Sequence, residues 1–158
     1  MQADLQLTPE LNFIMEIKNR SASFEYFIED KFDAGMMLTG TEVKALRDGR
    51  ASFNDSYCLL DHGAVYIKSL HISPYEHGSY ANHNPTRERK LLLHKKEINK
   101  IVLKMKEKGF TIVPLRIYFN ERGFAKIQIG LGKGKKTHDK RESIKKRESD
   151  REIKRYLA

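Results

Sequence analysis

His71, His77 and His83 recur at intervals of six residues, and Glu76 lies next to the second of them. Imidazole nitrogens and carboxylate oxygens are common zinc ligands, so these side chains raise the question of a metal site. Zinc ligands on one element are usually closer in sequence, as in the H-x3-H pattern of a helix, and an interval of six fits no such pattern. We therefore expect polar surface histidines and no bound metal. A metal-dependent nuclease is the alternative that these histidines would serve.

Cys58 is the only cysteine of the chain and lies in an apolar, strand-like segment. We expect a buried, unreactive thiol, because a reactive cysteine needs an exposed and electropositive setting. A single thiol can form neither an internal disulfide nor a cysteine-based zinc cage. This favours a reducing compartment, the cytoplasm.

The segment GLGKGKK, residues 130–136, resembles a phosphate-binding loop in its glycines and lysines. It lacks the G-K-[ST] ending of such a loop, and no packed helix is expected directly after it. We therefore interpret Gly130, Gly132 and Gly134 as a flexible hinge. Nowhere does the sequence assemble a base, a nucleophile and an oxyanion donor, so we predict that the protein is not an enzyme and uses no cofactor.

Residues 74–90 form a long polar loop, and loops of this length in a small domain are uncommon and often functional. Its side chains fall into two chemical kinds. The basic ones suit phosphate groups and the flat rings suit stacking on unpaired bases: Arg87, Arg89 and Lys90, and Tyr75, Tyr80 and His83. This combination indicates RNA binding, although loop aromatics also serve as simple anchors.

The positive charge of the chain is concentrated near its C-terminus. The 158 residues include 30 Lys and Arg against 21 Asp and Glu, and the formal net charge is +9. Residues 133–158 carry eleven basic and five acidic side chains, so this tail holds +6 of that charge. Such a tail favours a polyanionic partner, nucleic acid before an anionic membrane, or else merely solubilises the chain. No apolar run approaches the roughly 20 residues of a membrane helix, and no signal peptide is evident.

Hydrophobic alternation, helical spacing and turn residues predict the elements that position these groups. Strands are expected at residues 24–28, 36–38, 56–60, 65–72, 112–119 and 124–131, and helices at 41–47 and 94–108. A bend or bulge is expected near Ser69, where the apolar phase shifts, and an edge position or bulge at Pro114. About six short strands, mostly linked by hairpins, predict a mainly β fold, a small antiparallel barrel with flanking helices.

We expect three parts in the chain. Residues 1–22, with the apolar cluster Leu11, Phe13, Ile14 and Ile17, are a lead-in packed on or near the barrel, and residues 23–132 form the barrel. Residues 133–158 hold few large apolar groups, so they cannot bury enough surface to order themselves alone. Pairs such as Glu142 with Lys146 still favour a helix, and we predict a tail that is disordered alone and helical on a partner.

Several blocks of the sequence resemble the SmpB family, the SsrA-binding proteins that are the bacterial partners of transfer-messenger RNA. The blocks are NRSASFEYFIE (19–29), DAGMMLTGTEVKALRDGRAS (33–52), DSY (55–57), HISPYEHG (71–78), NHNPTRERKLLLHKKEI (82–98) and GKGKKTHDKRESIKKRE (132–148). Their order and spacing make the resemblance specific, and it extends from residue 19 to the end of the chain.

The resemblance implies a non-enzymatic protein with an oligonucleotide-binding (OB) type β-barrel. Its body would bind the tRNA-like domain of transfer-messenger RNA. That RNA is charged by alanyl-tRNA synthetase and delivered with elongation factor Tu to the A site of a stalled ribosome. The tail would then enter the decoding centre of the small subunit, meet ribosomal RNA, and fold as a helix in the vacant mRNA channel.

By matching position, the resemblance implies RNA-binding roles for Asn19, Asp33 and Leu92, and decoding-centre roles for Gly134, Lys136, His138, Asp139, Lys140 and Arg141. The basic and polar side chains of the sequence complete the two expected sets. For RNA binding by the body we expect Asn19, Arg20, Asp33, Glu42, Lys44, His83, Arg87, Arg89, Lys90 and Leu92. For the decoding centre and mRNA channel we expect Gly134, Lys135, Lys136, His138, Asp139, Lys140, Arg141, Lys145 and Arg147. Asp33 stands where the family usually has Glu and keeps the carboxylate. The alternative function is a generic OB-fold protein that binds single-stranded RNA.

Overall fold

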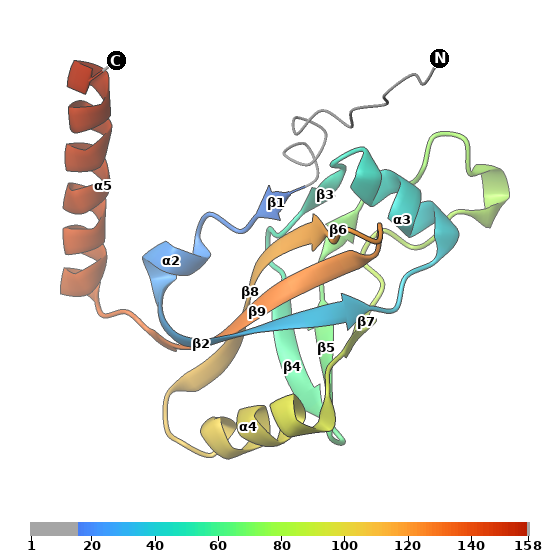
Figure 1. The fold of residues 1–158 in the computed structure, drawn as a ribbon, viewed down its shortest axis with the longest axis horizontal. Coiled ribbons are helices and arrows are strands. Elements are labelled where there is room, and N and C mark those ends of the chain that lie inside the picture. The colour runs from blue at the N-terminus through green and yellow to red at the C-terminus, as the bar shows by residue number, and fades with distance from the viewer. Residues whose placement is uncertain (1–15, 158) are drawn as a thin grey trace, which may run out of the picture.

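The structure is a computed structural model that describes residues 16–157, so Leu11, Phe13 and Ile14 of the expected apolar cluster lie outside the described residues. Figure 1 shows a curved sheet flanked by helices, with one long helix standing apart. The elements in chain order are β1 (Ile17–Lys18), α2 (Ala22–Glu25), β2 (Tyr26–Met36), α3 (Gly40–Arg47), β3 (Ala51–Ser52), β4 (Tyr57–Asp61), β5 (Ala64–Lys68), β6 (His71–Ile72), η1 (Ser79–Ala81), β7 (Arg89–Leu92), α4 (Lys95–Met105), β8 (Phe110–Phe119), β9 (Ala125–Gly134) and α5 (Thr137–Leu157).

The main sheet has seven strands in the order β1-β8-β9-β2-β7-β5-β4, and β3 pairs with β6 in a separate ladder. Every pairing is antiparallel. The sheet curls until β4 lies near β8, but no ladder of hydrogen bonds joins these two strands. The predicted mainly β, antiparallel class is confirmed, and the sheet is a curled, open one. The short strands β1, β3 and β6 raise the number above the expected six, because two residues carry no detectable alternation.

The core lies on the concave side of this sheet. Ile127, Ile129 and Leu131 alternate along β9 and are fully buried, as the sequence pattern predicted. Leu46 of α3 and Ile101 of α4 belong to the same buried core. Each such side chain contributes about 1.5–3 kcal/mol to the stability of the fold by leaving water. Because the apolar side chains point to one face, the other face of the sheet is left to polar groups. Cys58 belongs to the same core, and burial raises the pKa of its thiol, in agreement with the expected unreactive cysteine.

Two helices start with reciprocal capping. Thr39 caps α3, where a cap had been expected at Thr41, because its side chain pairs with Glu42 three residues on. His94 and Glu97 form the corresponding box of α4. α4 is shorter than expected: it ends at Met105, and Gly109 adopts a positive φ of 90° in the connection to β8.

The hairpins follow the sequence prediction closely. β4 and β5 pair across the turn at His62 and Gly63, and β8 and β9 pair across a turn that contains Gly123. The predicted irregularities are present, since Ser69 has a φ of 58° and the register of β8 shifts after Pro114. The expected strand at 24–28 begins later, because Ala22–Glu25 form the short helix α2. Of the expected strand at 36–38, only Met36 is in a strand, the last residue of β2.

The expected hinge is instead part of the sheet. Gly130 and Gly132 lie inside β9, opposite the register shift of β2 between Ile28 and Asp30. A Cβ on Gly132 would lie 2.6 Å from the Phe27 carbonyl oxygen, and one on Gly130 would lie 2.8 Å from the Ile28 Cγ2. These glycines therefore allow the bulged strand to approach, and they provide no flexible joint.

Gly132→Ala is expected to lower the free energy of unfolding by about 1–3 kcal/mol, because the new methyl group meets a backbone oxygen that cannot rotate away. Urea denaturation measures this loss. Gly134→Ala is the matched control, since a Cβ on Gly134 would have no heavy atom within 4 Å and the stability should not change. Equal stability of both variants and the parent chain would contradict the packing role.

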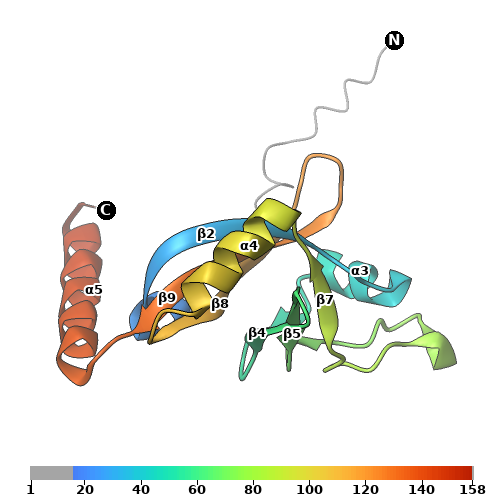
Figure 2. The same ribbon diagram turned by 90° about the horizontal axis from the view of Figure 1, so that it is seen from below.

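The tail forms a single helix. α5 spans 21 residues and none of them is buried. Figures 1 and 2 show it separated from the sheet. The helix contacts α2. The helix agrees with the i,i+4 charge pairs of the sequence, and the disorder of the isolated tail stays a prediction. β9 runs to Gly134, so the sheet continues two residues past the expected end of the barrel at residue 132.

Candidate nucleic-acid interface

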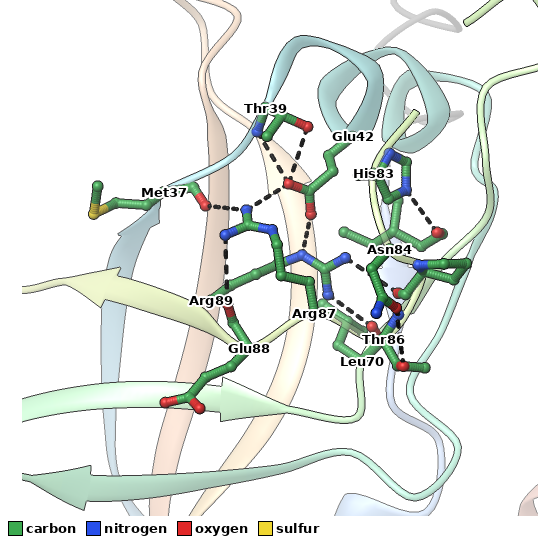
Figure 3. A network of polar contacts seen from close by, with 12 residues as sticks. Met37, Thr39, Glu42, Leu70, His83, Asn84, Thr86, Arg87, Glu88 and Arg89 are labelled. Carbon is green, nitrogen blue, oxygen red and sulfur yellow. Dashed lines mark hydrogen bonds and ion pairs between the residues drawn. The ribbon is translucent and has the colours of Figure 1, made fainter. Parts of the chain in front are cut away.

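A buried ion-pair network joins α3 to β7 and to the segment before it (Figure 3). The Glu42 carboxylate accepts hydrogen bonds from Arg89 Nε and, at 2.5 Å, from Arg87 Nη2. The Thr39 backbone N–H also donates to it, at 3.0 Å. Arg89 Nη1 donates to the Leu70 carbonyl at 2.7 Å. One carboxylate thus holds two arginines and the start of a helix, and it ties together segments that lie far apart in the sequence.

The network keeps its charges although Glu42 and Arg89 are fully buried. Burial raises the pKa of the Glu42 carboxyl. Hydrogen bonds from Arg87, the Thr39 N–H and Arg89 together outweigh burial and hold this pKa below its ordinary value. The ionised carboxylate is therefore the form that the fold stabilises.

This burial corrects part of the sequence interpretation. Glu42 and Arg89 were expected to contact RNA, but neither side chain reaches the surface. Arg89 lies in β7, a strand that the polar composition of the loop concealed. Arg87 is only partly exposed and donates to Glu42 and to the Met37 carbonyl, so it stiffens the loop. Glu42, Arg87 and Arg89 thus stabilise the elements beneath the expected RNA-binding surface, and other side chains must form that surface.

His83 also has a structural role in the loop. Its Nε2 lies 2.8 Å from the Ile72 carbonyl oxygen, and its Nδ1 lies 2.8 Å from the Thr41 hydroxyl. Because a carbonyl only accepts, Nε2 carries a proton and donates to Ile72, and Nδ1 forms a second hydrogen bond with the Thr41 hydroxyl. Both ring nitrogens are thus engaged within the protein, and none is left to read a base. Tyr80, by contrast, is fully exposed at the loop tip.

The convex side of the sheet brings together side chains from four strands. We call it the outer face: Lys31 and Asp33 of β2, Lys90 and Leu92 of β7, Arg116 and Tyr118 of β8, and Lys126 and Gln128 of β9. Register pairs Asp33 with Gln128 and Gln128 with Arg116, so these three side chains form one row across the sheet. The sequence interpretation included only Asp33, Lys90 and Leu92. The alternation of β9 was the available signal for Lys126.

Hydrogen bonds hold the centre of the outer face in place. The Tyr118 hydroxyl donates to Asp33 at 2.8 Å, and the Arg116 guanidinium lies 4.4 Å from the centre of the Tyr118 ring. Burial raises the pKa of Tyr118, and the hydrogen bond to the Asp33 carboxylate adds to this increase. Asp33 thus orients an aromatic ring and, through it, a guanidinium. Rings and guanidinium groups in this arrangement suit RNA bases and phosphates.

A shallow groove of about 450 Å³ continues the outer face toward α3. Leu92 and Phe124 line it and remain 50% and 64% exposed, and Lys126 and Arg47 are at its rim. Exposed apolar side chains next to basic ones favour the flat surface and charged backbone of a nucleic acid. Leu92 therefore lies at the surface, where the resemblance places an RNA-binding residue.

Three expected RNA-binding residues of the body, Asn19, Arg20 and Lys44, lie outside the outer face. The Asn19 amide donates to the Pro114 carbonyl at 2.8 Å and its oxygen accepts from Ser21 at 3.0 Å, so it fastens β1 and α2 to β8. Arg20 is exposed beside it. On the other side, the Lys44 ammonium lies 5.2 Å from the centre of the Tyr75 ring.

The tail residues lie at the junction before α5 and along that helix. Gly134 ends β9, whereas Lys136, His138, Arg141, Lys145 and Arg147 are exposed. Asp139 accepts from the backbone N–H of Lys136 at 3.3 Å and lies 3.1 Å from His138 Nε2, and Lys140 is partly exposed. Lys135 and Arg147 differ from the rest because they contact the body: the Lys135 ammonium donates to the Ser23 carbonyl, and the Arg147 guanidinium lies 5.5 Å from the centre of the Phe24 ring.

Residues 16–157 contain no group of three or more His, Cys, Asp or Glu side chains placed to hold a metal ion. Among the helices of the same residues, none combines the length and the apolar composition needed to cross a membrane.

Comparisons with known proteins agree with one another. The family model described as SmpB protein matches residues 16–158. An SsrA-binding protein of Geobacter sulfurreducens is 52% identical over 139 residues, which cover 88% of this chain and 90% of that protein. One of Halalkalibacterium halodurans is 54% identical over 140 residues, covering 89% and 90%.

A solved chain described as "tmRNA-SmpB: a journey to the center of the bacterial ribosome" matches with a TM-score of 0.67 and 47% identity. The match covers 82% of this chain and 94% of that chain. The chain that forms this sheet, its outer face and the exposed basic helix is thus about half identical in sequence to SsrA-binding proteins. The chain belongs to the SmpB protein family.

Proposed function

We propose that this protein is an RNA-binding adaptor of trans-translation. Its sheet binds the tRNA-like domain of transfer-messenger RNA and supports delivery of that RNA to the A site of stalled ribosomes. α5 then occupies the decoding centre and the mRNA channel. Elongation factor Tu and alanyl-tRNA synthetase join through the RNA complex. The protein acts in the cytoplasm, where the ribosomes are, and catalyses no reaction itself.

One observation carries this proposal: the basic residues form two separate surfaces of different kinds. The outer face lies on hydrogen-bonded strands and is held by contacts such as that of Tyr118 with Asp33. α5 buries none of its residues and extends away from the sheet (Figure 1). A rigid surface suits an RNA that is already folded, whereas an exposed helix suits a channel. The names of the SsrA-binding relatives support transfer-messenger RNA as the folded partner.

A competition gel shift tests the proposed function. The labelled tRNA-like domain is bound to the protein and displaced either by the same RNA or by an unstructured oligomer of equal length. We expect the folded RNA to compete at least about tenfold better, because the outer face recognises shape. Equal competition would instead support a generic OB-fold protein for single-stranded RNA. Cleavage of the RNA that a chelator prevents would support the metal-dependent nuclease.

The same assay tests the outer face. Lys126→Ala should weaken binding of the tRNA-like domain about tenfold, the loss of one charge-assisted contact to a phosphate. Lys108→Ala is the matched control: it removes the same charge from an exposed residue in the turn that precedes β8, whereas Lys126 lies at the opposite, hairpin end of the β8–β9 pair. Equal weakening by both variants would show that only net charge matters.

A further inference from the structure

A pocket of about 460 Å³ lies between the N-terminal elements and the outer face. We call it the side pocket, and basic, amide and aromatic side chains from β1, the turn after it, β2, β8 and β9 line it: Lys18, Arg20, Phe27, Lys31, Arg116 and Gln128. Sites for small ligands in proteins measure roughly 300–1,000 Å³, so the side pocket has room for one nucleotide.

Hydrogen bonds hold the Arg116 guanidinium at this pocket. Its Nη1 donates to the Glu16 carboxylate at 3.0 Å, and its Nε donates to the Gln128 side-chain oxygen at 3.4 Å. The guanidinium also lies 4.4 Å from the centre of the Tyr118 ring. A guanidinium has five N–H donors, of which these bonds use two, and within residues 16–157 the other three have no acceptor. Arg116 is therefore preorganised and still has donors for a ligand.

The Glu16 carboxylate makes Arg116 a poor site for a phosphate group. The two side chains are 35% and 31% exposed, so solvent screens their ion pair only in part. A phosphate bound to the same guanidinium would lie close to this carboxylate and be repelled by it. The edge of a base carries hydrogen-bond acceptors but no net charge. It can therefore accept from the remaining donors of Arg116 without that repulsion.

Among the bases, guanine presents the edge that matches these donors. Its O6 and N7 are adjacent acceptors, to which an arginine donates two hydrogen bonds at once, whereas the same edge of adenine offers one acceptor and one donor group. The Phe27 ring, which is 51% exposed, provides a face on which an unpaired base can stack. Lys18, Arg20 and Lys31 are exposed around the pocket and suit the phosphates on either side of that base.

We propose that the side pocket binds one unpaired guanine base of the RNA and that Arg116 determines this specificity. The base is unpaired because the deep, narrow major groove of an RNA duplex hides O6 and N7. The inference rests on the proposed function, since the RNA that lies on the outer face must supply the base. It adds base recognition to a surface whose other contacts recognise shape and charge.

Titration of the full chain with single nucleotides tests the pocket without the RNA. The ¹⁵N-labelled protein is titrated with GMP and, separately, with AMP, which carries the same phosphate. The NMR signals of the Arg116 Nε–H and the Gln128 side-chain amide are followed. We expect both signals to shift with GMP and its dissociation constant to be about tenfold lower than that of AMP, because only guanine accepts both hydrogen bonds. Equal dissociation constants, or GMP binding that leaves both signals in place, would overturn the inference.

Arg116→Lys separates the shape of the guanidinium from its charge. Lysine can keep the ion pair with Glu16 but lacks the planar fork that donates two hydrogen bonds to one edge, so GMP and AMP should bind this variant equally. Arg122→Lys is the matched control: it makes the same exchange at an exposed residue of the β8–β9 turn and should keep the tenfold preference. Phe27→Leu is a second variant, which should weaken both nucleotides by a similar factor because stacking tolerates either base. A preference for GMP that survives in Arg116→Lys would contradict the role of Arg116.

The gel shift with the tRNA-like domain connects the pocket to the proposed function. Arg116→Lys should weaken binding about tenfold and leave the salt dependence of the affinity unchanged, because the charge is retained. Lys31→Ala should weaken binding and reduce the salt slope by about one, as expected for a phosphate contact. Unchanged affinity of Arg116→Lys would show that Arg116 contacts only phosphate, against the inference. A parent chain that prefers GMP but does not bind the tRNA-like domain would overturn the proposed function and leave the side pocket as a guanine site.

Discussion

A chain truncated after Lys136 is expected to bind the tRNA-like domain of transfer-messenger RNA as tightly as the full chain and to lose all tagging on stalled ribosomes. The truncation removes α5, which buries none of its residues, so the sheet should keep its stability. Without α5, nothing of the protein would reach the decoding centre. A gel shift measures the first property, and incorporation of the tag on ribosomes stalled at the end of an mRNA measures the second.

The position of the cut follows from the structure. A cut after residue 132 would remove Gly134, which pairs with Tyr26, and Lys135, whose N–H donates to the Glu25 carbonyl. It would therefore disrupt β9, and a loss of RNA binding could no longer be separated from the loss of the tail. Lys126→Ala in the full chain is the complementary control, since it should weaken RNA binding while α5 stays intact. Equal loss of binding and tagging in the truncated chain would refute the division between body and tail.

Glu42→Gln is expected to lower the free energy of unfolding by about 3–5 kcal/mol, because the buried Arg89 guanidinium loses the charge that compensates it. The total stability of a domain is only about 5–15 kcal/mol, so the variant should unfold at a much lower urea concentration. Glu88→Gln is the matched control. Its ion pair with Lys68, 3.6 Å long, is exposed, and such pairs contribute at most about 1 kcal/mol. Similar losses for both variants would contradict the role of the buried network.

The difference in stability between the parent chain and Glu42→Gln is expected to depend on pH. Burial raises the pKa of Glu42, but its hydrogen bonds with Arg87, Thr39 and Arg89 hold it below the ordinary value of 4.5. A group with a lowered pKa in the folded state stabilises the protein fully above its unfolded pKa and loses this effect as the pH falls through the folded pKa. The stability advantage of the parent chain over Glu42→Gln should therefore be constant above pH 4.5 and shrink below it. A constant advantage throughout acid pH would contradict this assignment.

Patterns that repeat over a few residues were predictable from the sequence. The alternation of Ile127, Ile129 and Leu131 identified the core side of β9, and Gly63 and Gly123 marked the turns of two hairpins. The stripe of apolar residues that includes Ile101 predicted α4. These features depend on neighbours along the chain, which is why composition and spacing reveal them. The uneven charge of residues 133–158 is likewise a property of residue order.

Residue order alone established a mainly β body with one dry face, a strongly basic tail and, through the motif blocks, the resemblance to SmpB. Only the tertiary structure could assign individual side chains, because their surroundings come from distant parts of the chain. The Arg89 guanidinium has the chemistry to bind a phosphate, but in the folded protein it is buried and paired with Glu42, 47 residues away. Strand register similarly placed Arg116 and Lys126 beside Asp33, and the contact of Lys135 with Ser23, 112 residues away, separated it from the other tail lysines.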